Sequence, residues 1–258
     1  TSSSRTWHAR GQNFALAYTE LNGEATFVRP DEPDEHFLLI PAKGLSARIE
    51  TDLGPTLLGG LSVTIVPPGR SVVQVQGTGA LVHVFCCGAG DILRKSMNNA
   101  SYERRHNNVA ELQRWPEPVG GYRLRTYSLD IPSSPNRFGR IFQTRALMIN
   151  FLDPWIGPRD RTRLSPHSHA DFEQGSLGLE GEFVHHLRWP WTTSMADWRE
   201  DEHLHCGSPS LTIIPPPSIH TTEATGVRTN QIVDIFAPPR LDFVRQGWVL
   251  NHEEYPPP

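Results

Sequence analysis

The chain has little cysteine, no excess of basic residues and no long apolar run. Its three cysteines, two of them adjacent at Cys86 and Cys87, cannot form a disulfide framework and fit a reducing compartment. Lys and Arg number 24 against 28 Asp and Glu, which leaves no positive excess to neutralise a nucleic-acid backbone. No stretch approaches the roughly 20 apolar residues of a membrane span, and the N-terminus has no apolar signal segment. We therefore expect a cytoplasmic protein without a nucleic-acid or membrane partner.

Helical patterns are also scarce, whereas turn residues are common. The 258 residues include 23 prolines and 21 glycines, which separate short apolar segments typical of strands. These segments are residues 14–21, 37–41, 57–66, 80–86, 146–152, 211–214 and 232–236. The best helix candidate is 91–112, which ends before a proline-rich turn. The sequence therefore predicts an all-β fold with little helix.

Part of the first half is repeated in the second half. Residues 64–72, TIVPPGRSV, align without gaps with residues 212–220, TIIPPPSIH, and both predict strand, proline turn and strand. Further along, LVHVF at 81–85 corresponds to IVDIF at 232–236. Because a repeat defines domains better than length does, we expect two copies of one β-module, residues 1–120 and 121–258.

Histidine is concentrated in the second copy, where seven of the twelve lie between residues 167 and 220. His167 and His169 form an H-x-H pair. Residues i and i+2 of an extended segment project from one face, so both imidazoles can share one ion. Gln174 and, after three prolines, His220 add two more candidate donors. The spacing of these residues indicates a metal site.

The first part of this pattern resembles the first motif of the cupin superfamily. That motif is H-x-H, three or four residues, Glu or Gln, six residues and Gly, and it matches His167, His169, Gln174 and Gly181. Glu173 is the alternative fourth donor, since a carboxylate is commoner in the family. We prefer Gln174 because it keeps the family distance to Gly181, whereas a one-residue slip turns a strand side chain to the opposite face. A bulge would allow Glu173 instead.

The second cupin motif, Pro-x-Gly-x-x-His, corresponds to Pro215 and His220, although Pro217 replaces its glycine. The resemblance covers both motifs of the second copy. It implies a bicupin, with two double-stranded β-helix (jelly-roll) barrels in one chain. It also implies one divalent transition metal in the C-terminal barrel only, with the ligands His167, His169, Gln174 and His220.

The first copy lacks the corresponding histidines. Its equivalent positions hold Pro30, Glu32, Phe37 and Val72. We expect a degenerate N-terminal cupin that serves as a packing or dimer-forming partner, and hence a homo-oligomer, most simply a dimer.

Three further residues are candidates for acid–base catalysis. His185 and His186 follow the glycine turn, and in a strand one must face the barrel interior while the other faces away. Asp234 lies in an apolar run, where a buried carboxylate needs a partner. A second H-x-H, His203-Leu204-His205-Cys206, suits zinc but has no further ligand nearby in sequence.

Several tryptophans and arginines carry weaker expectations. Trp189, Trp191 and Trp198 are candidates for a pocket mouth, although aromatic side chains more often pack. A substrate carboxylate could be clamped by one of three arginines, but a solvated arginine is the default. These are Arg145, Arg188 and Arg228.

The donor set leads to three hypotheses for function. Three imidazoles and an amide leave a divalent ion its full charge, which favours Lewis-acid catalysis of isomerase or lyase type on a small oxygen-rich carbonyl or carboxylate metabolite. The alternatives are an Fe(II)-dependent dioxygenase of a chelating substrate, as the three-histidine dioxygenases of the superfamily imply, and a non-catalytic metabolite-binding cupin. The donors do not distinguish Fe, Mn, Zn and Ni.

Overall fold

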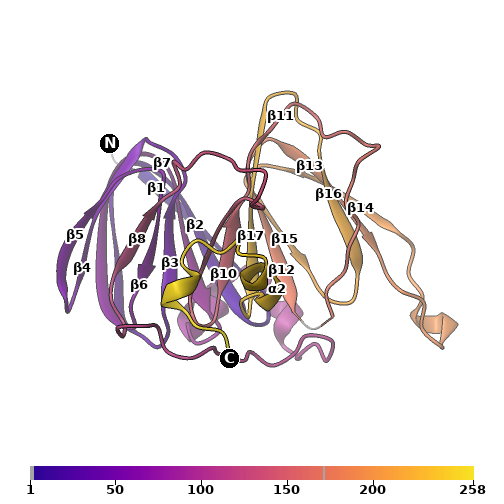
Figure 1. Ribbon diagram of the computed structural model, residues 1–258, viewed down its shortest axis with the longest axis horizontal. Helices are drawn as coiled ribbons and strands as arrows, with labels where there is room; N and C mark the ends of the chain where they lie inside the picture. Colours follow the sequence, from indigo (N-terminus) through magenta and orange to yellow (C-terminus); the bar gives the residue numbers. More distant parts are fainter. Residues whose placement is uncertain (1–2, 171) are drawn as a thin grey trace.

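The computed structural model describes residues 3–170 and 172–258, which form two β-rich halves (Figure 1). The strands of the first half are β1 (Ser3–Arg10), β2 (Phe14–Glu32), β3 (His36–Ile40), β4 (Leu45–Thr51), β5 (Gly54–Leu58), β6 (Ser62–Val66), β7 (Gly69–Cys86) and β8 (Arg125–Ser128). They form one sheet in the order β1-β2-β7-β3-β6-β8, with β4 between β5 and β7. Because β7 pairs with β4 along its first part and with β3 along its second, the sheet curls around its own core. The first sheet also includes residues beyond 120, since β8 pairs with β6.

The second half has two antiparallel sheets that face each other across a shared core. The larger sheet, in the order β15-β12-β17-β10-β9 with β11 beside β17, contains β9 (Arg140–Gln143), β10 (Met148–Phe151), β11 (Trp155–Ile156), β12 (Glu173–Glu180), β15 (Ser210–Ile214) and β17 (Thr229–Ala237). The smaller sheet, in the order β14-β13-β16, contains β13 (Glu182–Arg188), β14 (Glu202–Gly207) and β16 (Ile219–Ala224). It lies at the right of Figure 1. The predicted all-β class is confirmed.

Helices are short among the described residues: α1 (Gly90–Lys95), α2 (Leu241–Arg245) and the 3-10 turns η1 (Asn99–Tyr102), η2 (Met195–Asp197) and η3 (His252–Glu254). The prediction of a helix over 91–112 is therefore wrong beyond its first turns. The helix ends at Ser96, whose backbone is extended, and the side chain of Asn98 then donates to the carbonyl of Arg10 and accepts from its N–H, a tertiary contact. Within the described residues, no helix is long and apolar enough to cross a membrane.

A single apolar cluster joins the two halves because their central strands are buried on both faces. In β3, Phe37 and Leu39 pack into this central core, whereas Leu38 and Ile40 point into the first barrel. In β17, Val233 and Ile235 pack into the same core. The alternate residues of β17, including Asp234, therefore face the interior of the second barrel.

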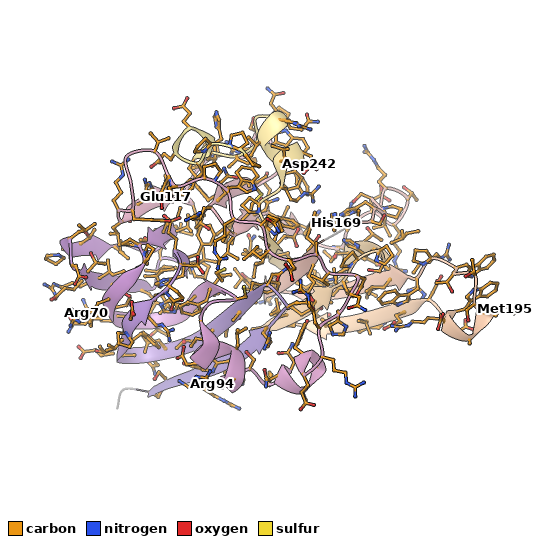
Figure 2. All side chains as sticks on the ribbon, turned by 90° about the horizontal axis from the view of Figure 1, so that it is seen from below. Arg70, Arg94, Glu117, His169, Met195 and Asp242 are labelled. Carbon is orange, nitrogen blue, oxygen red and sulfur yellow. The ribbon has the colours of Figure 1, made fainter. Side chains whose placement is uncertain are left out.

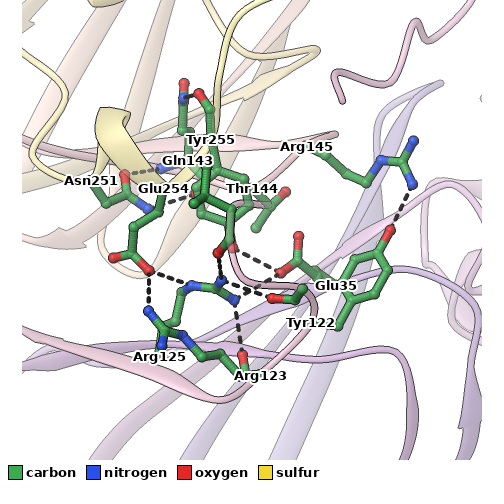
Figure 3. A network of polar contacts seen from close by, with 12 residues as sticks. Glu35, Tyr122, Arg123, Arg125, Gln143, Thr144, Arg145, Asn251, Glu254 and Tyr255 are labelled. Atoms are coloured by element: carbon green, nitrogen blue, oxygen red, sulfur yellow. Dashed lines mark hydrogen bonds and ion pairs between the residues drawn. The ribbon is translucent and has the colours of Figure 1, made fainter. Parts of the chain in front are cut away.

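A polar network also ties the end of the described chain to the first half (Figure 3). Tyr255 donates its hydroxyl to Oε1 of Glu35 at 2.8 Å, and both residues are at least 99% buried. Glu254 accepts from Tyr127 at 2.6 Å and forms an ion pair with Arg125 at 2.5 Å. Burial raises the pKa of Glu35 to about 7, although the Tyr255 hydroxyl and the charge of Arg125 oppose this shift. The network thus joins segments that are distant in the sequence.

Candidate metal centre

The second barrel brings the three predicted histidine ligands together. One ring nitrogen from each of His167, His169 and His220 lies within 4.8 Å of the other two. It is the one such group of three or more His, Cys, Asp or Glu residues within the described ranges. His167 lies before β12 and His220 in β16, and their backbones exchange hydrogen bonds of 3.0 and 2.7 Å. This isolated bridge connects the two sequence motifs directly.

Backbone carbonyls orient two of these imidazoles. Nδ1 of His167 lies 2.9 Å from the carbonyl oxygen of Ser165, and Nδ1 of His220 lies 3.1 Å from that of Ser218. A carbonyl only accepts, so each Nδ1 carries the proton and each Nε2 presents its lone pair. Metal-bound histidines are commonly fixed by an outer hydrogen bond of this kind.

Gln174 supplies an oxygen to the same point. Its Oε1 lies 3.0 Å from Nε2 of His169 and 3.4 Å from Nε2 of His220. Donors about 2.1 Å from one ion and 90 to 110° apart are separated by about 3.0 to 3.4 Å, so the donor spacing fits a transition metal. Glu173 lies elsewhere: it accepts from the backbone N–H of Gln12 and, at 3.2 Å, from the hydroxyl of Tyr102. Its carboxylate therefore connects the two halves.

Burial keeps the inner imidazoles of the site neutral. It lowers the pKa of His169 to about 3 and that of His220 to about 4, with smaller contributions from nearby positive charge, including Arg240. A neutral imidazole is the form that binds a metal. His167 is exposed, so the site opens to solvent on the side of this residue.

His185 and His186 lie on opposite faces of β13. His185 is 1% exposed and its Nδ1 lies 3.0 Å from Oγ1 of Thr222. Burial and the adjacent His220 lower its pKa to about 4. His186 contacts His203 and Glu223 on the outer face of the small sheet. Of the two candidates, only His185 therefore lies beside the triad.

Asp234 belongs to a row of polar side chains beneath the triad. Asn150, Asp234, Ser176 and Thr212 follow one another across β10, β17, β12 and β15. Ser176 donates to Oδ1 of Asp234 at 3.1 Å, and burial raises the pKa of Asp234 to about 6. Both amide atoms of Asn150 are buried without a partner among the described residues. Since Gln174 is two residues from Ser176 on the same face, this row borders the metal layer.

Arg240 is a functional candidate that the sequence did not indicate. Its guanidinium carbon lies 5.6 Å from the ring centre of Phe172 and 5.1 Å from that of Phe236. Phe172 stacks on His169 with ring centres 4.4 Å apart. Arg240 also forms an ion pair with Asp242 at 2.6 Å. Asp242 and His169 are both labelled in Figure 2. No motif spacing could find Arg240, because it follows β17 after two prolines and reaches the site through tertiary packing.

The other sequence candidates form their polar and ring contacts with residues outside the triad, although Arg188 lines a hollow that His220 also borders. Arg145 donates to the Tyr122 hydroxyl in the network of Figure 3, and Arg188 pairs with Asp201 on the surface. Trp191 and Trp198 stack on each other in the 189–201 loop, near Met195 at the far end of the molecule in Figure 2. Trp189 donates to Glu202. Arg228 is exposed.

The strand register corrects one equivalence between the two copies. Gln174 opposes Ile214, and the counterpart of Ile214, Val66, opposes His36. The counterpart of Gln174 is therefore His36 rather than Phe37. Both ring nitrogens of His36 are buried without a partner among the described residues. Its ring stacks on Phe85 with centres 4.9 Å apart.

Comparisons with solved structures support a cupin fold. A variant of oxalate decarboxylase from Bacillus subtilis aligns with a TM-score of 0.58 and 12% identity over 92% of this chain and 73% of the other. AerE from Microcystis aeruginosa aligns with a TM-score of 0.58 and 9% identity, covering 92% and 93%. The 7S globulin of Momordica charantia gives 0.53 and 13%, covering 89% and 74%. No family model and no curated protein sequence matches the chain.

The geometry and these likenesses define the chain as a protein of cupin fold with two jelly-roll halves and a histidine triad in the second. At identities of 9 to 13%, the comparisons show the fold alone.

Proposed function

We propose that this protein is a divalent-metal-dependent cupin enzyme that acts on a small oxygen-rich carbonyl or carboxylate metabolite. The proposed reaction is of isomerase or lyase type. The observation that carries the proposal is a group of three imidazoles with ligand atoms within 4.8 Å of one another. The amide oxygen of Gln174 lies beside two of them, His169 and His220.

The proposed ligands are His167, His169, Gln174 and His220, because their spacing and oriented lone pairs fit one transition-metal ion. When bound, the ion supplies Lewis-acid polarisation of a substrate oxygen, undiminished by any anionic ligand. The exposed position of His167 leaves a side of the site through which a small molecule can enter.

The surroundings of the triad support the proposed substrate class. Arg240, which is ion-paired with Asp242, lies beside the phenylalanines that pack against His169, and its remaining N–H groups are suited to a carboxylate. His185, buried next to His220, offers a neutral imidazole that can accept a proton or donate a hydrogen bond. Similar structures include enzymes named for the decarboxylation of oxalate, and the one from Bacillus subtilis is described with Mn(II) centres. These features favour a small carboxylate.

Elemental analysis of gently purified protein tests the proposal, combined with oxygen uptake and product analysis on a panel of keto acids, hydroxy acids, catechols and β-diketones. We expect one equivalent of a divalent transition metal, its loss in His167→Ala and His220→Ala, and turnover without oxygen uptake. His252→Ala removes a histidine outside the site and should keep the ion.

Each other outcome selects an alternative. One equivalent of iron with substrate-dependent oxygen uptake would establish the Fe(II)-dependent dioxygenase. An ion that binds normally without turnover of any panel member, together with saturable binding of one of them, would favour the metabolite-binding cupin. Full metal content in His220→Ala would refute the ligand assignment.

A further inference from the structure

We infer that the outer face of the small sheet carries a second transition-metal site, formed by His186 and His203. This inference does not depend on the proposed function. His186 lies in β13 and His203 in β14, directly opposite each other in the strand register. Their Nδ1 atoms are 2.7 Å apart. Two ring nitrogens from neighbouring strands thus already converge on one point.

Glu223 fixes the ring of His186. Its Oε2 lies 3.2 Å from Nε2 of His186, and its Oε1 accepts from Arg161 at 2.6 Å. The ion pair with Arg161 lowers the pKa of Glu223, so its carboxylate accepts the Nε2 proton of His186. With its Nε2 beside Glu223, the ring of His186 turns its Nδ1 toward Nδ1 of His203. A carboxylate–histidine pair of this kind is the common outer support of a metal ligand.

To admit an ion, the two rings must move apart and turn, so that both lone pairs point to one position. Nitrogens about 2.0 to 2.1 Å from a tetrahedral ion are about 3.3 Å apart, which is about 0.6 Å more than the present separation. His203 is exposed, so its ring can make this adjustment. With an ion bound, His203 would coordinate through Nδ1 and carry its ring proton on Nε2.

The site is open to solvent. His186 and His203 line a hollow of about 190 Å³ together with Arg188 and Asp201, and His220 also borders this hollow. The Asp201 carboxylate is ion-paired with Arg188 at 2.5 Å and is therefore not a free ligand. Water molecules would complete the coordination sphere of the ion. Two imidazoles with water suit a borderline ion such as Zn²⁺, Ni²⁺ or Cu²⁺ rather than Mg²⁺ or Ca²⁺. The ion would join β14 to β13, the strand with which it pairs in the small sheet.

Equilibrium dialysis of the full chain against Zn²⁺ tests this site. We expect two bound equivalents in two steps, the tighter one lost in His167→Ala. The weaker one should be lost in His203→Gln and in His186→Gln. Glu223→Gln keeps the two imidazoles but weakens their outer support, and should raise the second dissociation constant about 10- to 100-fold.

His205→Gln is the matched control, because His205 is an exposed histidine two residues from His203 on the same strand. This variant should keep both equivalents. A wild-type protein that binds one equivalent, or a second equivalent that survives unchanged in His203→Gln, would overturn the inference. Loss of the second equivalent in His205→Gln alone would also overturn it. Circular dichroism of each variant separates loss of binding from loss of fold.

Discussion

At the scale of single residues, Gln174 determines the charge of the candidate metal centre. Its neutral oxygen stands 3.0 Å from the nearest imidazole nitrogen, whereas the carboxylate of its neighbour Glu173 is held by Gln12 and Tyr102. The sphere of proposed ligands therefore contains no anion. The ion would be more electrophilic and less tightly held than one with a carboxylate ligand.

Replacing Gln174 should change metal affinity in both directions. Gln174→Ala removes a donor and should weaken binding by at least about tenfold, since even outer-sphere partners contribute about 10- to 100-fold. Gln174→Glu supplies an anion at the same position and should tighten binding. Competition with a chelator measures both constants. Equal affinities in the wild type and Gln174→Ala would show that Gln174 is not a ligand.

The residue scale also shows where sequence reasoning succeeds and where it stops. The proximity of the H-x-H pair, Gln174 and His220 could be predicted because motif spacing is a local property, whereas their binding of a metal stays a prediction. Arg240 was not, because its approach to His169 depends on the packing of Phe172 and Phe236. The identity of His36 as the counterpart of Gln174 required the strand register, since one residue of slip exchanges the two faces.

At the scale of elements, the turn between β12 and β13 requires glycine at position 181. Gly181 has a φ of +97°, and a β-carbon there would lie 2.8 Å from the carbonyl oxygen of Thr229 and from Cα of Asn230. Besides the side-chain oxygen of Asn230, these obstacles are backbone atoms, which cannot move aside cheaply. This turn sets the register of β13 and therefore the inward position of His185.

Gly181→Ala should destabilise the protein by about 2 to 5 kcal/mol, which combines about 1 to 2 for the left-handed backbone with about 1 to 3 for the close contacts. Gly157→Ala is the matched control, because Gly157 has a φ of +80° and nothing within 4 Å of its added carbon. It should lose only the backbone part. Urea unfolding compares the two, and equal losses would contradict the steric argument.

The first barrel carries an acid-sensitive element where β3 and β7 meet. His36 and His83 lie with ring centres 5.9 Å apart, and burial lowers the pKa of His83 to about 4 and that of His36 well below its usual value. Between pH 6.5 and 4 the unfolded chain binds a proton at His83 that the folded protein does not. The contribution of His83 to the free energy of unfolding is therefore largest above pH 6.5 and decreases as the pH falls toward 4.

His83→Phe should remove the contribution of His83 to this sensitivity while keeping an aromatic ring beside Phe27 and Phe85. The slope of unfolding free energy against pH should fall by about 1.4 kcal/mol per pH unit between pH 6 and 4.5, which corresponds to one proton. Denaturant titrations at several pH values measure it. His205→Gln, at an exposed position, should leave the slope of unfolding free energy against pH unchanged. The same slope in His83→Phe as in the wild type would contradict the role given to His83.

At the scale of the whole molecule, two kinds of contact unite the halves. The central apolar core combines outward faces of β3 and β7 with those of β10, β12 and β17. The polar network around Glu35 and Tyr255 adds directional contacts (Figure 3). The internal repeat indicated two β-modules, but it could not indicate this joint, because contacts between distant segments leave no periodic signal in either one.

Tyr255→Phe tests the coupling between the halves. It deprives the buried carboxylate of Glu35 of its hydroxyl donor and should cost about 1 to 3 kcal/mol. The hydrogen bond from Tyr255 lowers the Glu35 pKa, so removing this bond destabilises the ionised form of Glu35. The loss of unfolding free energy should therefore be larger at pH 8, where Glu35 is ionised, than at pH 5. Thermal unfolding at the two pH values measures this. Tyr122→Phe, at the less buried Arg145 contact, should show a smaller and pH-independent loss.

The contact between Glu35 and Tyr255 spans 220 residues, and this separation matters while the chain is being made. At about 5 to 20 residues per second, a ribosome needs roughly 10 to 45 s to proceed from one residue to the other. During that interval the emerging first barrel exposes the apolar face that β10, β12 and β17 later cover. The nascent barrel must therefore remain apart from its copies on neighbouring ribosomes until its own second half arrives.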